Sequence, residues 1–126
     1  METTMTPAKY TTLAACLNAF QTTFNENTRV KKLIKNWKRS IIVDATDTGA
    51  VMTMVIDDLM MNEVKEGAHA DEDYPIHLQG SQETLIKIFS GDYNPAHALI
   101  DGALAVFSNE RDKVKLEAIT MVIWGM

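Results

Sequence analysis

The sequence has little cysteine and no long apolar run. Cys16 is the single cysteine among 126 residues, which excludes an internal disulfide and a multi-cysteine zinc or iron–sulfur site. No apolar stretch approaches the roughly 18 residues that a membrane-spanning helix needs. Residues 1–6 also lack the basic start and the apolar segment of a secretory leader. We therefore expect a cytoplasmic protein in a reducing compartment.

The patterns on which common enzymes depend are lacking as well. The chain has no glycine-rich phosphate loop and no dinucleotide-binding fingerprint, and neither Ser81 nor Ser108 lies in a nucleophile-elbow sequence. Cys16 has no His or basic residue beside it that would activate a thiol. We expect no catalytic residue, no cofactor and no enzymatic activity.

One tetrapeptide, Asp47-Thr48-Gly49-Ala50, does match the segment that carries the catalytic carboxylate of aspartic proteases. In those enzymes the Asp follows a continuous apolar strand, whereas Thr46 precedes it here and Asp44 lies close by. Asp and Gly also satisfy the backbone geometry of a tight turn. A hairpin turn at Asp47 is the favoured interpretation, and a protease-like enzyme using Asp47 stays a distant alternative.

A second cluster consists of His69 and the acidic residues Asp71, Glu72 and Asp73, whose nitrogen and oxygen atoms are of the kind that divalent cations bind. The other histidines, His77 and His97, lie on separate expected elements. A solvated loop is the favoured interpretation, so we expect no metal.

What the sequence does have is the composition of a single folded domain over residues 1–126. Apolar residues make up 46% and charged residues 23%, as in globular proteins, and the formal net charge is -5. The charge is uneven, because positions 29 to 39 hold basic residues and no acidic one. These basic residues are Arg29, Lys31, Lys32, Lys35, Lys38 and Arg39.

The spacing of the apolar residues predicts an α+β fold. Some stretches repeat apolar residues at the helical spacing, and others alternate with a period of two, as half-buried strands do. Turn residues and helix caps separate these stretches. The expected elements, in order, are a helix from Thr6 to Phe24, a helix capped by Asn25 or Asn27 that runs to Trp37, strands over 40–46, 50–57, 60–65 and 74–79, helices over 82–90 and 95–101, a strand over 103–107 and a helix capped by Asn109.

Methionine is common, with eight residues in the chain. Met52 and Met54 lie with Ile56 on one face of an expected strand. Core packing alone explains such residues, while flexible thioethers also suit a pocket that adapts to ligands of variable shape. Both interpretations stay open.

Several spaced positions form a pattern together. In the second half of the chain they are Asp73, Ile76, Leu78, Gly80-Ser81, Glu83, Leu85, Ile88, Gly91, Asn94-Pro95, Ala98, Gly102, Leu104 and Val106. Trp37, the strand pair 41–57 around the Asp-x-Gly turn and the apolar C-terminal helix extend the pattern over about residues 10–124. This pattern resembles the sterol carrier protein type-two family.

The resemblance implies a five-stranded mixed sheet covered on one face by helices. An apolar tunnel between sheet and helices would bind and carry a sterol, a fatty acid, a fatty acyl-CoA or another lipid without transforming it. The expected tunnel lining is Met52, Met54, Ile56, Ile76, Leu78, Phe89, Leu99, Leu104, Val106, Ile119, Val122 and Ile123. The competing hypothesis is a structural or regulatory module with a filled core and no ligand.

Two surfaces have open interpretations. The six basic residues between positions 29 and 39 form either an ordinary solvated face or a weak contact with an anionic membrane or lipid headgroup. Nucleic acid is not expected, because the surrounding charge is negative and no aromatic residues alternate with the basic ones. Ala103, Ala105 and Phe107 stand where the family usually has polar residues, which indicates either a homodimer contact or a covered sheet edge.

Overall fold

The computed structural model describes residues 10–70 and 75–125, and within these it has the expected order of elements. The prediction of a helix from Thr6 was wrong in its start, because Thr12 is the N-cap and the helix begins at Leu13. Thr6 itself and the acidic residues Asp71, Glu72 and Asp73 lie outside the described residues. The elements are α1 (Leu13–Glu26), α2 (Thr28–Leu33), β1 (Arg39–Ala45), β2 (Val51–Asp57), β3 (Met60–Glu66), β4 (Ile76–Gly80), α3 (Gln82–Phe89), α4 (Pro95–Ile100), β5 (Leu104–Phe107) and α5 (Glu110–Trp124).

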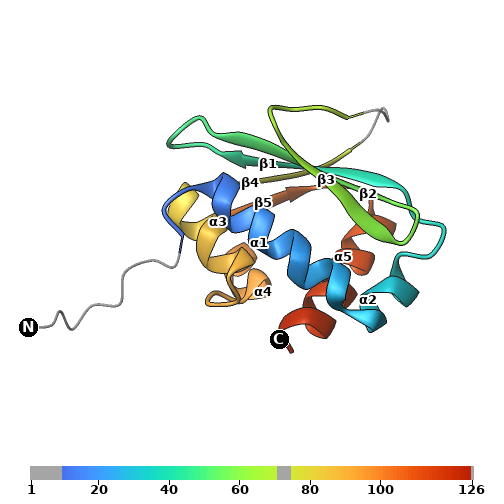
Figure 1. Ribbon diagram of the computed structural model, residues 1–126. Helices are drawn as coiled ribbons and strands as arrows, with labels where there is room; N and C mark the ends of the chain where they lie inside the picture. The colour runs from blue at the N-terminus through green and yellow to red at the C-terminus, as the bar shows by residue number, and fades with distance from the viewer. Residues whose placement is uncertain (1–9, 71–74, 126) are drawn as a thin grey trace, which may run out of the picture.

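The five strands form one mixed sheet in the order β3-β2-β1-β4-β5. β1 and β4 are parallel, and the other neighbours are antiparallel. The helices lie on one face of this sheet, below it in Figure 1. The predicted fold class, a five-stranded mixed sheet with helices on one face, is therefore confirmed.

The register of the sheet places apolar side chains in rows on the face toward the helices. Ile41 in β1 is opposite Met54 of β2 and Ile76 of β4, and all three are at most 4% exposed. The alternation seen in the sequence produces these rows, since every second residue of a strand points to the same face. The rows form the sheet side of the core.

The opposite face of the sheet is partly covered by the chain that leaves β3. The hydroxyl of Thr53 donates a 2.6 Å hydrogen bond to the carbonyl oxygen of Gly67 and accepts one of 3.0 Å from the backbone N–H of His69. Thr53 is 0% exposed in consequence, although it points away from the helices. A buried hydroxyl is tolerated here because both of its hydrogen-bonding functions are used.

The second helix is shorter than its sequence predicts. The apolar stripe reaches Trp37, but α2 ends at Leu33 and Asn36 has a φ of 60°, a left-handed conformation that a helix does not continue through. The indole N–H of Trp37 instead donates a 3.0 Å hydrogen bond to Oδ1 of Asp112 in α5. The prediction of a helix to Trp37 was wrong, because a hydrogen bond to a distant residue sets this segment's path.

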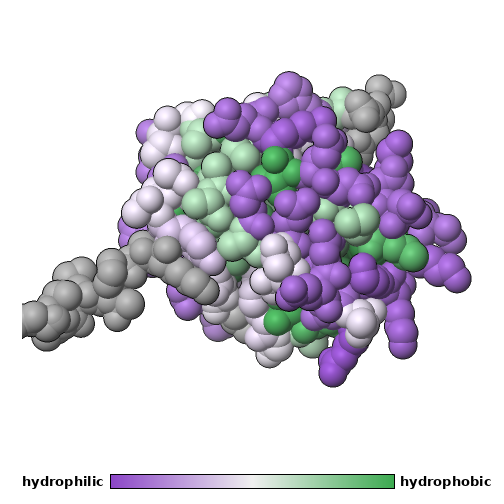
Figure 2. All heavy atoms as spheres, viewed as in Figure 1, coloured by the Kyte–Doolittle hydropathy of each residue, from purple (hydrophilic) through white to green (hydrophobic). Residues whose placement is uncertain are grey.

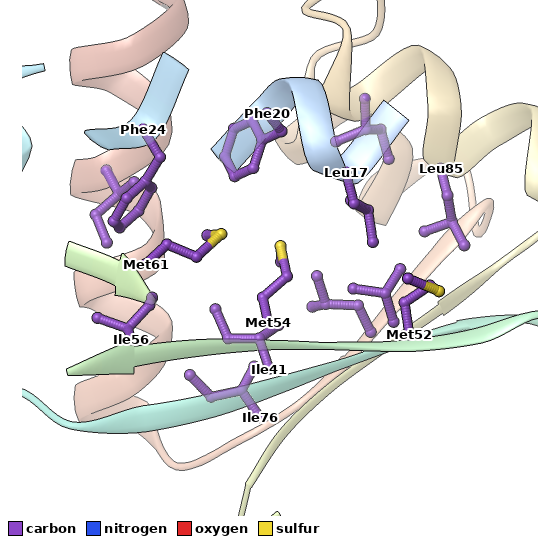
Figure 3. Close-up of a cluster of buried hydrophobic side chains, with 14 of the residues drawn as sticks. Leu17, Phe20, Phe24, Ile41, Met52, Met54, Ile56, Met61, Ile76 and Leu85 are labelled. Atoms are coloured by element: carbon purple, nitrogen blue, oxygen red, sulfur yellow. The ribbon is translucent and has the colours of Figure 1, made fainter. Parts of the chain in front are cut away.

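The core differs between its two ends. At one end, the side chains lie near one another: Leu17 of α1, Met52 of β2 and Leu85 of α3 (Figure 3). At the other end a wider space separates the helix from the sheet, and Phe20 and Phe24 of α1 point across it toward Met54 and Met61. All seven side chains are buried, with exposed fractions of 6% or less. Within the part of the chain that the structure describes, no helix is long and apolar enough to cross a bilayer.

Candidate ligand-binding site

A pocket of about 560 Å³ lies between the sheet and the helices, at the wider end of the core. Every strand contributes to its wall, as do α1, α3, α4 and α5. The sheet side is lined by Ile41, Met54, Ile56, Met61, Leu78, Leu104 and Val106, and the helix side by Phe20, Phe24, Ile88, Phe89, Leu116, Ile119 and Trp124. The wall of this space is therefore mostly apolar.

Aromatic rings form the helix side of the pocket. The Phe20 ring lies edge-on to Phe89 with a centroid distance of 5.0 Å, and it lies 5.5 Å from the Trp124 ring. Phe24 lies 6.0 Å from Phe20 on the same side. These distances are in the range where aromatic pairs attract each other beyond their area of contact. The rings support one another, so this side of the pocket has a defined shape.

Gly91 lets the Trp124 ring lie close to the backbone. A Cβ atom at position 91 would be 3.0 Å from Cδ1 of Trp124, and the residue has a φ of +84°. Both facts require glycine here, since other residues rarely adopt this φ and have no room for their side chain. The end of α3 thus supports the pocket wall that α5 provides.

The mouth of the pocket lies between α4 and the second half of α5. Three residues line the pocket and are also well exposed: Leu99 (46%), Ile100 (81%) and Met121 (62%). Asn94 caps α4 by accepting a 2.8 Å hydrogen bond from the N–H of Ala96. The helix was expected to turn Leu99 inward, but its position at the mouth leaves that residue half open to solvent.

The two ends of α4 are tied together. The Tyr93 hydroxyl donates a 2.6 Å hydrogen bond to Oδ2 of Asp101, and this bond to the carboxylate raises the pKa of Tyr93 above its usual 10.0. Gly102 follows with a φ of +77° and leads the chain into β5. The Tyr93–Asp101 hydrogen bond thus supports α4, which carries Leu99 and Ile100 at the mouth.

The polar residues of the pocket also lie at its edge. They are Asn94, Lys113, Glu117 and Thr120. Lys113 lies 3.9 Å from the exposed Glu110, and the Thr120 hydroxyl donates to the Glu117 carbonyl oxygen at 2.8 Å. The charges of Lys113 and Glu117 are of opposite sign, so the edge carries no excess of one charge.

Eight of the twelve residues predicted to line the tunnel do line this pocket. They are Met54, Ile56, Leu78, Phe89, Leu99, Leu104, Val106 and Ile119. The other four do not: Met52 and Ile76 are buried in the core beside it, and Val122 and Ile123 pack partly buried against the core. That any of the twelve contacts a ligand stays a prediction.

Sequence reasoning missed the contribution of α1 and of the end of α5. Phe20 and Phe24 stand four residues apart on the apolar stripe of the first helix, and Trp124 is the last residue of the last helix. The stripe identifies Phe20 and Phe24 as inward, but it does not distinguish a residue that fills the core from one that borders a hollow. Met61 of β3 was missed for the same reason.

The basic residues of 29–39 are used in different ways. Arg29, Lys32 and Lys35 are exposed, and Lys31 donates a 3.2 Å hydrogen bond from Nζ to the Leu59 carbonyl oxygen. Nζ of Lys38 lies 3.9 Å from Oδ2 of Asp57. Arg39 is the most constrained, since its Nε lies 3.1 Å from the buried carboxylate of Asp112.

A second hollow, of about 580 Å³, lies at the surface between α2 and α5. It is lined by Leu33, Glu110, Arg111, Val114, Lys115 and Ala118. Val114 is 62% exposed, so this hollow is open to solvent. It shares no lining residue with the apolar pocket, and its wall includes charged side chains. We regard it as a groove between two packed helices.

Asp47 lies in the turn between β1 and β2, as the sequence predicts. Its Oδ1 accepts a 2.9 Å hydrogen bond from the N–H of Gln82 at the start of α3, and Gly49 in the same turn has a φ of +78°. The carboxylate is exposed and holds two elements together. Among the described residues, no group of three His, Cys, Asp or Glu side chains is placed to hold a metal ion.

The outer side of β5 is partly open. β5 is an edge strand that pairs with β4 alone. Ala103 and Ala105 are half-buried, and Phe107 is 55% exposed with its ring 6.2 Å from that of His77. A contact between two copies at this edge stays a prediction.

No family model and no curated protein sequence matches the chain, so comparison rests on structure. The chain has the fold of the sterol carrier protein 2 domains, as the sequence resemblance implied. A crystal structure of sterol carrier protein 2 matches with a TM-score of 0.63 and 16% identity, over 87% of this chain and 94% of that one. The sterol carrier protein domain 2 of Helicoverpa armigera matches with a TM-score of 0.62 and 18% identity, over 99% and 97%.

Two further solved structures show in which kinds of protein this fold occurs. The solution structure of palmitated SCP2L2 from Aedes aegypti matches with a TM-score of 0.52 and 17% identity, over 86% of this chain and 94% of that one. The sec-alkylsulfatase Pisa1 from a Pseudomonas species matches with a TM-score of 0.56 and 11% identity, over 74% of this chain but 14% of the enzyme. At these identities the likeness shows the fold alone, and the fold occurs inside an enzyme as well as in separate domains.

Proposed function

We propose that the protein is a single lipid-binding domain that holds one apolar ligand, such as a sterol or a fatty acyl chain, in the pocket between the sheet and α1, α4 and α5. The observation that carries this proposal is the pocket of about 560 Å³ with its mostly apolar wall. Its volume is within the range of about 300–1,000 Å³ typical of small-molecule sites.

The physical chemistry of the wall favours a ligand with a long apolar part. Burying about ten methylene groups at roughly 0.8 kcal/mol each contributes about 8 kcal/mol before the costs of association. Met54 and Met61 lie in the sheet wall, and their flexible thioethers adapt to ligands of different shape. The palmitated relative of the same fold supports an acyl chain as one such ligand.

We propose further that the ligand is bound without being transformed. The polar residues that line the described pocket are an amide, a hydroxyl, an amine and a carboxylate, all near the edge. The Thr120 hydroxyl is hydrogen-bonded to a backbone carbonyl of its own helix. Asp47, the residue that the protease alternative requires, instead lies in the β1–β2 turn and is bonded to the start of α3.

The competing proposal is a structural module whose core binds nothing. Native mass spectrometry of freshly purified protein separates the two, since we expect bound lipid mass that is released intact on denaturation. A titration of delipidated protein with a fluorescent fatty acid should then saturate with micromolar affinity. Absence of both a co-purified lipid and a saturable signal, up to the solubility of the probe, would favour the filled core.

Trp124 gives an internal control for the site of binding. Because its ring lines the pocket, a ligand should change its emission, whereas Trp37 is 9% exposed and bonded to Asp112 outside the pocket. The ligand-dependent change should therefore be lost in Trp124→Phe. A change that persists in this variant would place the ligand elsewhere. If the fatty acid that was added is recovered from the protein with a different mass, the protein is an enzyme.

A further inference from the structure

We propose that the protein docks on a neutral or zwitterionic lipid surface through the apolar rim of the pocket, formed by Leu99 and Ile100 of α4 and Met121 of α5. This inference rests on the proposed function, because a rim around a pocket that binds no lipid would have no reason to meet a membrane. It assigns the docking surface to the pocket mouth and not to the basic residues of α2.

The exposure of the rim is the first argument. Large apolar side chains are well exposed at few positions in the described chain, and three of them lie together at one mouth. Ile100 is 81% exposed, the highest fraction in that group. Low in the view of Figure 2, apolar residues reach the surface near the place where Figure 1 shows α4 and the end of α5. Exposed apolar side chains that gather in one place next to a pocket, unlike ones scattered singly, are typical of an interaction site.

The charge of the rim indicates the kind of surface. Lys113 and Glu117 are the charged residues that line the pocket, and their signs are opposite. His97 on the exposed side of α4 and the Tyr93-bonded Asp101 add no cluster of one sign. A surface that attracts anionic lipids needs several basic residues together. The rim therefore matches a neutral or zwitterionic surface, into which apolar side chains insert.

The size of the rim argues against a protein partner. Three side chains cannot cover the roughly 800 Å² on each partner that a specific protein interface buries. A lipid surface sets no such minimum, because each apolar side chain inserts independently and gains its own transfer free energy. A lipid surface is thus the occupant that a rim of this size can hold, and the contact is weak and reversible.

The position of the rim separates it from the basic surface. Met121 lies near the C-terminal end of α5 and lines the pocket, whereas Glu110, Val114 and Ala118 lie nearer its start and line the hollow beside Leu33 of α2. Docking through the rim places the mouth against the lipid phase. Docking through Arg29, Lys32 and Lys35 would instead bring α2 and the residues after it to the lipid. Since a lipid molecule avoids water only if mouth and membrane meet, the rim is the productive surface.

The structure provides a matched pair for the test. Met121 and Val114 are each 62% exposed on α5, but only Met121 lines the pocket. We would measure co-flotation of the protein with phosphatidylcholine vesicles for the wild type, Ile100→Gln, Met121→Gln and Val114→Gln. Ile100→Gln and Met121→Gln should each lower the partition coefficient about tenfold, and the double variant Ile100→Gln/Met121→Gln should lower it further. Val114→Gln should leave partition within about twofold, and salt should have little effect.

Three outcomes would overturn the docking proposal. One is equal loss in Val114→Gln and Met121→Gln, which would indicate non-specific adsorption. Another is partition of the wild type only to vesicles containing phosphatidylserine, lost in Lys32→Glu/Lys35→Glu, which would assign docking to the basic surface. The third is absence of partition for the wild type. Ligand titration without vesicles is measured in parallel, so a protein that binds the probe but not vesicles refutes docking and leaves the proposed function standing.

Discussion

Nε of Arg39, at the start of β1, donates a 3.1 Å hydrogen bond to Oδ2 of Asp112, in the first turn of α5. Asp112 is 1% exposed, and its other oxygen accepts the 3.0 Å hydrogen bond from the Trp37 indole. A buried carboxylate is stable only when it is paired and hydrogen-bonded, as here. The pair fixes the start of α5 against the sheet and so holds the helix that forms one wall of the pocket.

We predict that Asp112→Ala lowers the free energy of unfolding by about 2 kcal/mol or more, because Arg39 and the Trp37 indole lose their shared partner. Asp57→Ala is the matched control. Asp57 pairs with Lys38 at 3.9 Å and both side chains are well exposed, so its loss should cost less than about 1 kcal/mol. Urea unfolding of the two variants measures the difference. Equal losses would show that the buried pair contributes no more than a surface pair.

A second prediction concerns Gly91, whose missing Cβ makes room for Trp124. Gly91→Ala should lower stability and change the emission of Trp124, because the new methyl group meets the ring at 3.0 Å. Gly102→Ala is the control, since Gly102 has a similar φ of +77° but nothing within 4 Å of its Cβ position. Both variants carry the same backbone strain, of about 1–2 kcal/mol. A larger loss and an emission shift in Gly91→Ala alone are expected, and identical behaviour would contradict the contact.

Much of the fold can be predicted from residues that lie close together in the sequence. The side chains of Ser81, Asn94 and Asn109 cap α3, α4 and α5 as expected, because a capping oxygen three residues or fewer from the orphan N–H needs no distant partner. The period-two stretches became β1 and β2 with their apolar residues on the predicted face. The order of elements follows from signals of this kind.

What could not be predicted depends on residues far apart in the chain. Asp112 reads as a solvated acid in the first turn of a helix, yet Arg39, 73 residues away, buries it. The same contact draws Trp37 out of the helix that its spacing indicates. The pocket is a further case: the sequence identifies Met52 and Met54 equally as inward, but the first packs in the core outside the pocket and the second lines it. Only the packing of separate elements decides between them.

A third prediction tests Asp47 as a turn residue. Asp47→Asn keeps the side-chain oxygen that accepts from the Gln82 N–H, so stability should change by less than about 0.5 kcal/mol. Asp47→Ala removes that acceptor at the start of α3, and it should cost about 1 kcal/mol, as loss of a helix cap does. Thermal unfolding compares the two. Reproducible peptide cleavage by the wild type that is lost in Asp47→Asn would instead support the protease-like alternative.

The last prediction tests whether the ligand occupies the pocket. Val106 and Ala105 are neighbours on β5, but Val106 lines the pocket and Ala105 points to the opposite face of the sheet. Val106→Phe places a ring in the space that an acyl chain would fill, and we expect the affinity for a fluorescent fatty acid to fall about tenfold or more. Ala105→Phe adds the same ring to the same strand on the other face, where it should leave affinity within about twofold. Circular dichroism of both variants shows whether the fold is retained. If both keep the fold and bind the probe as tightly as the wild type, the ligand does not lie against β5 and the pocket is not its site.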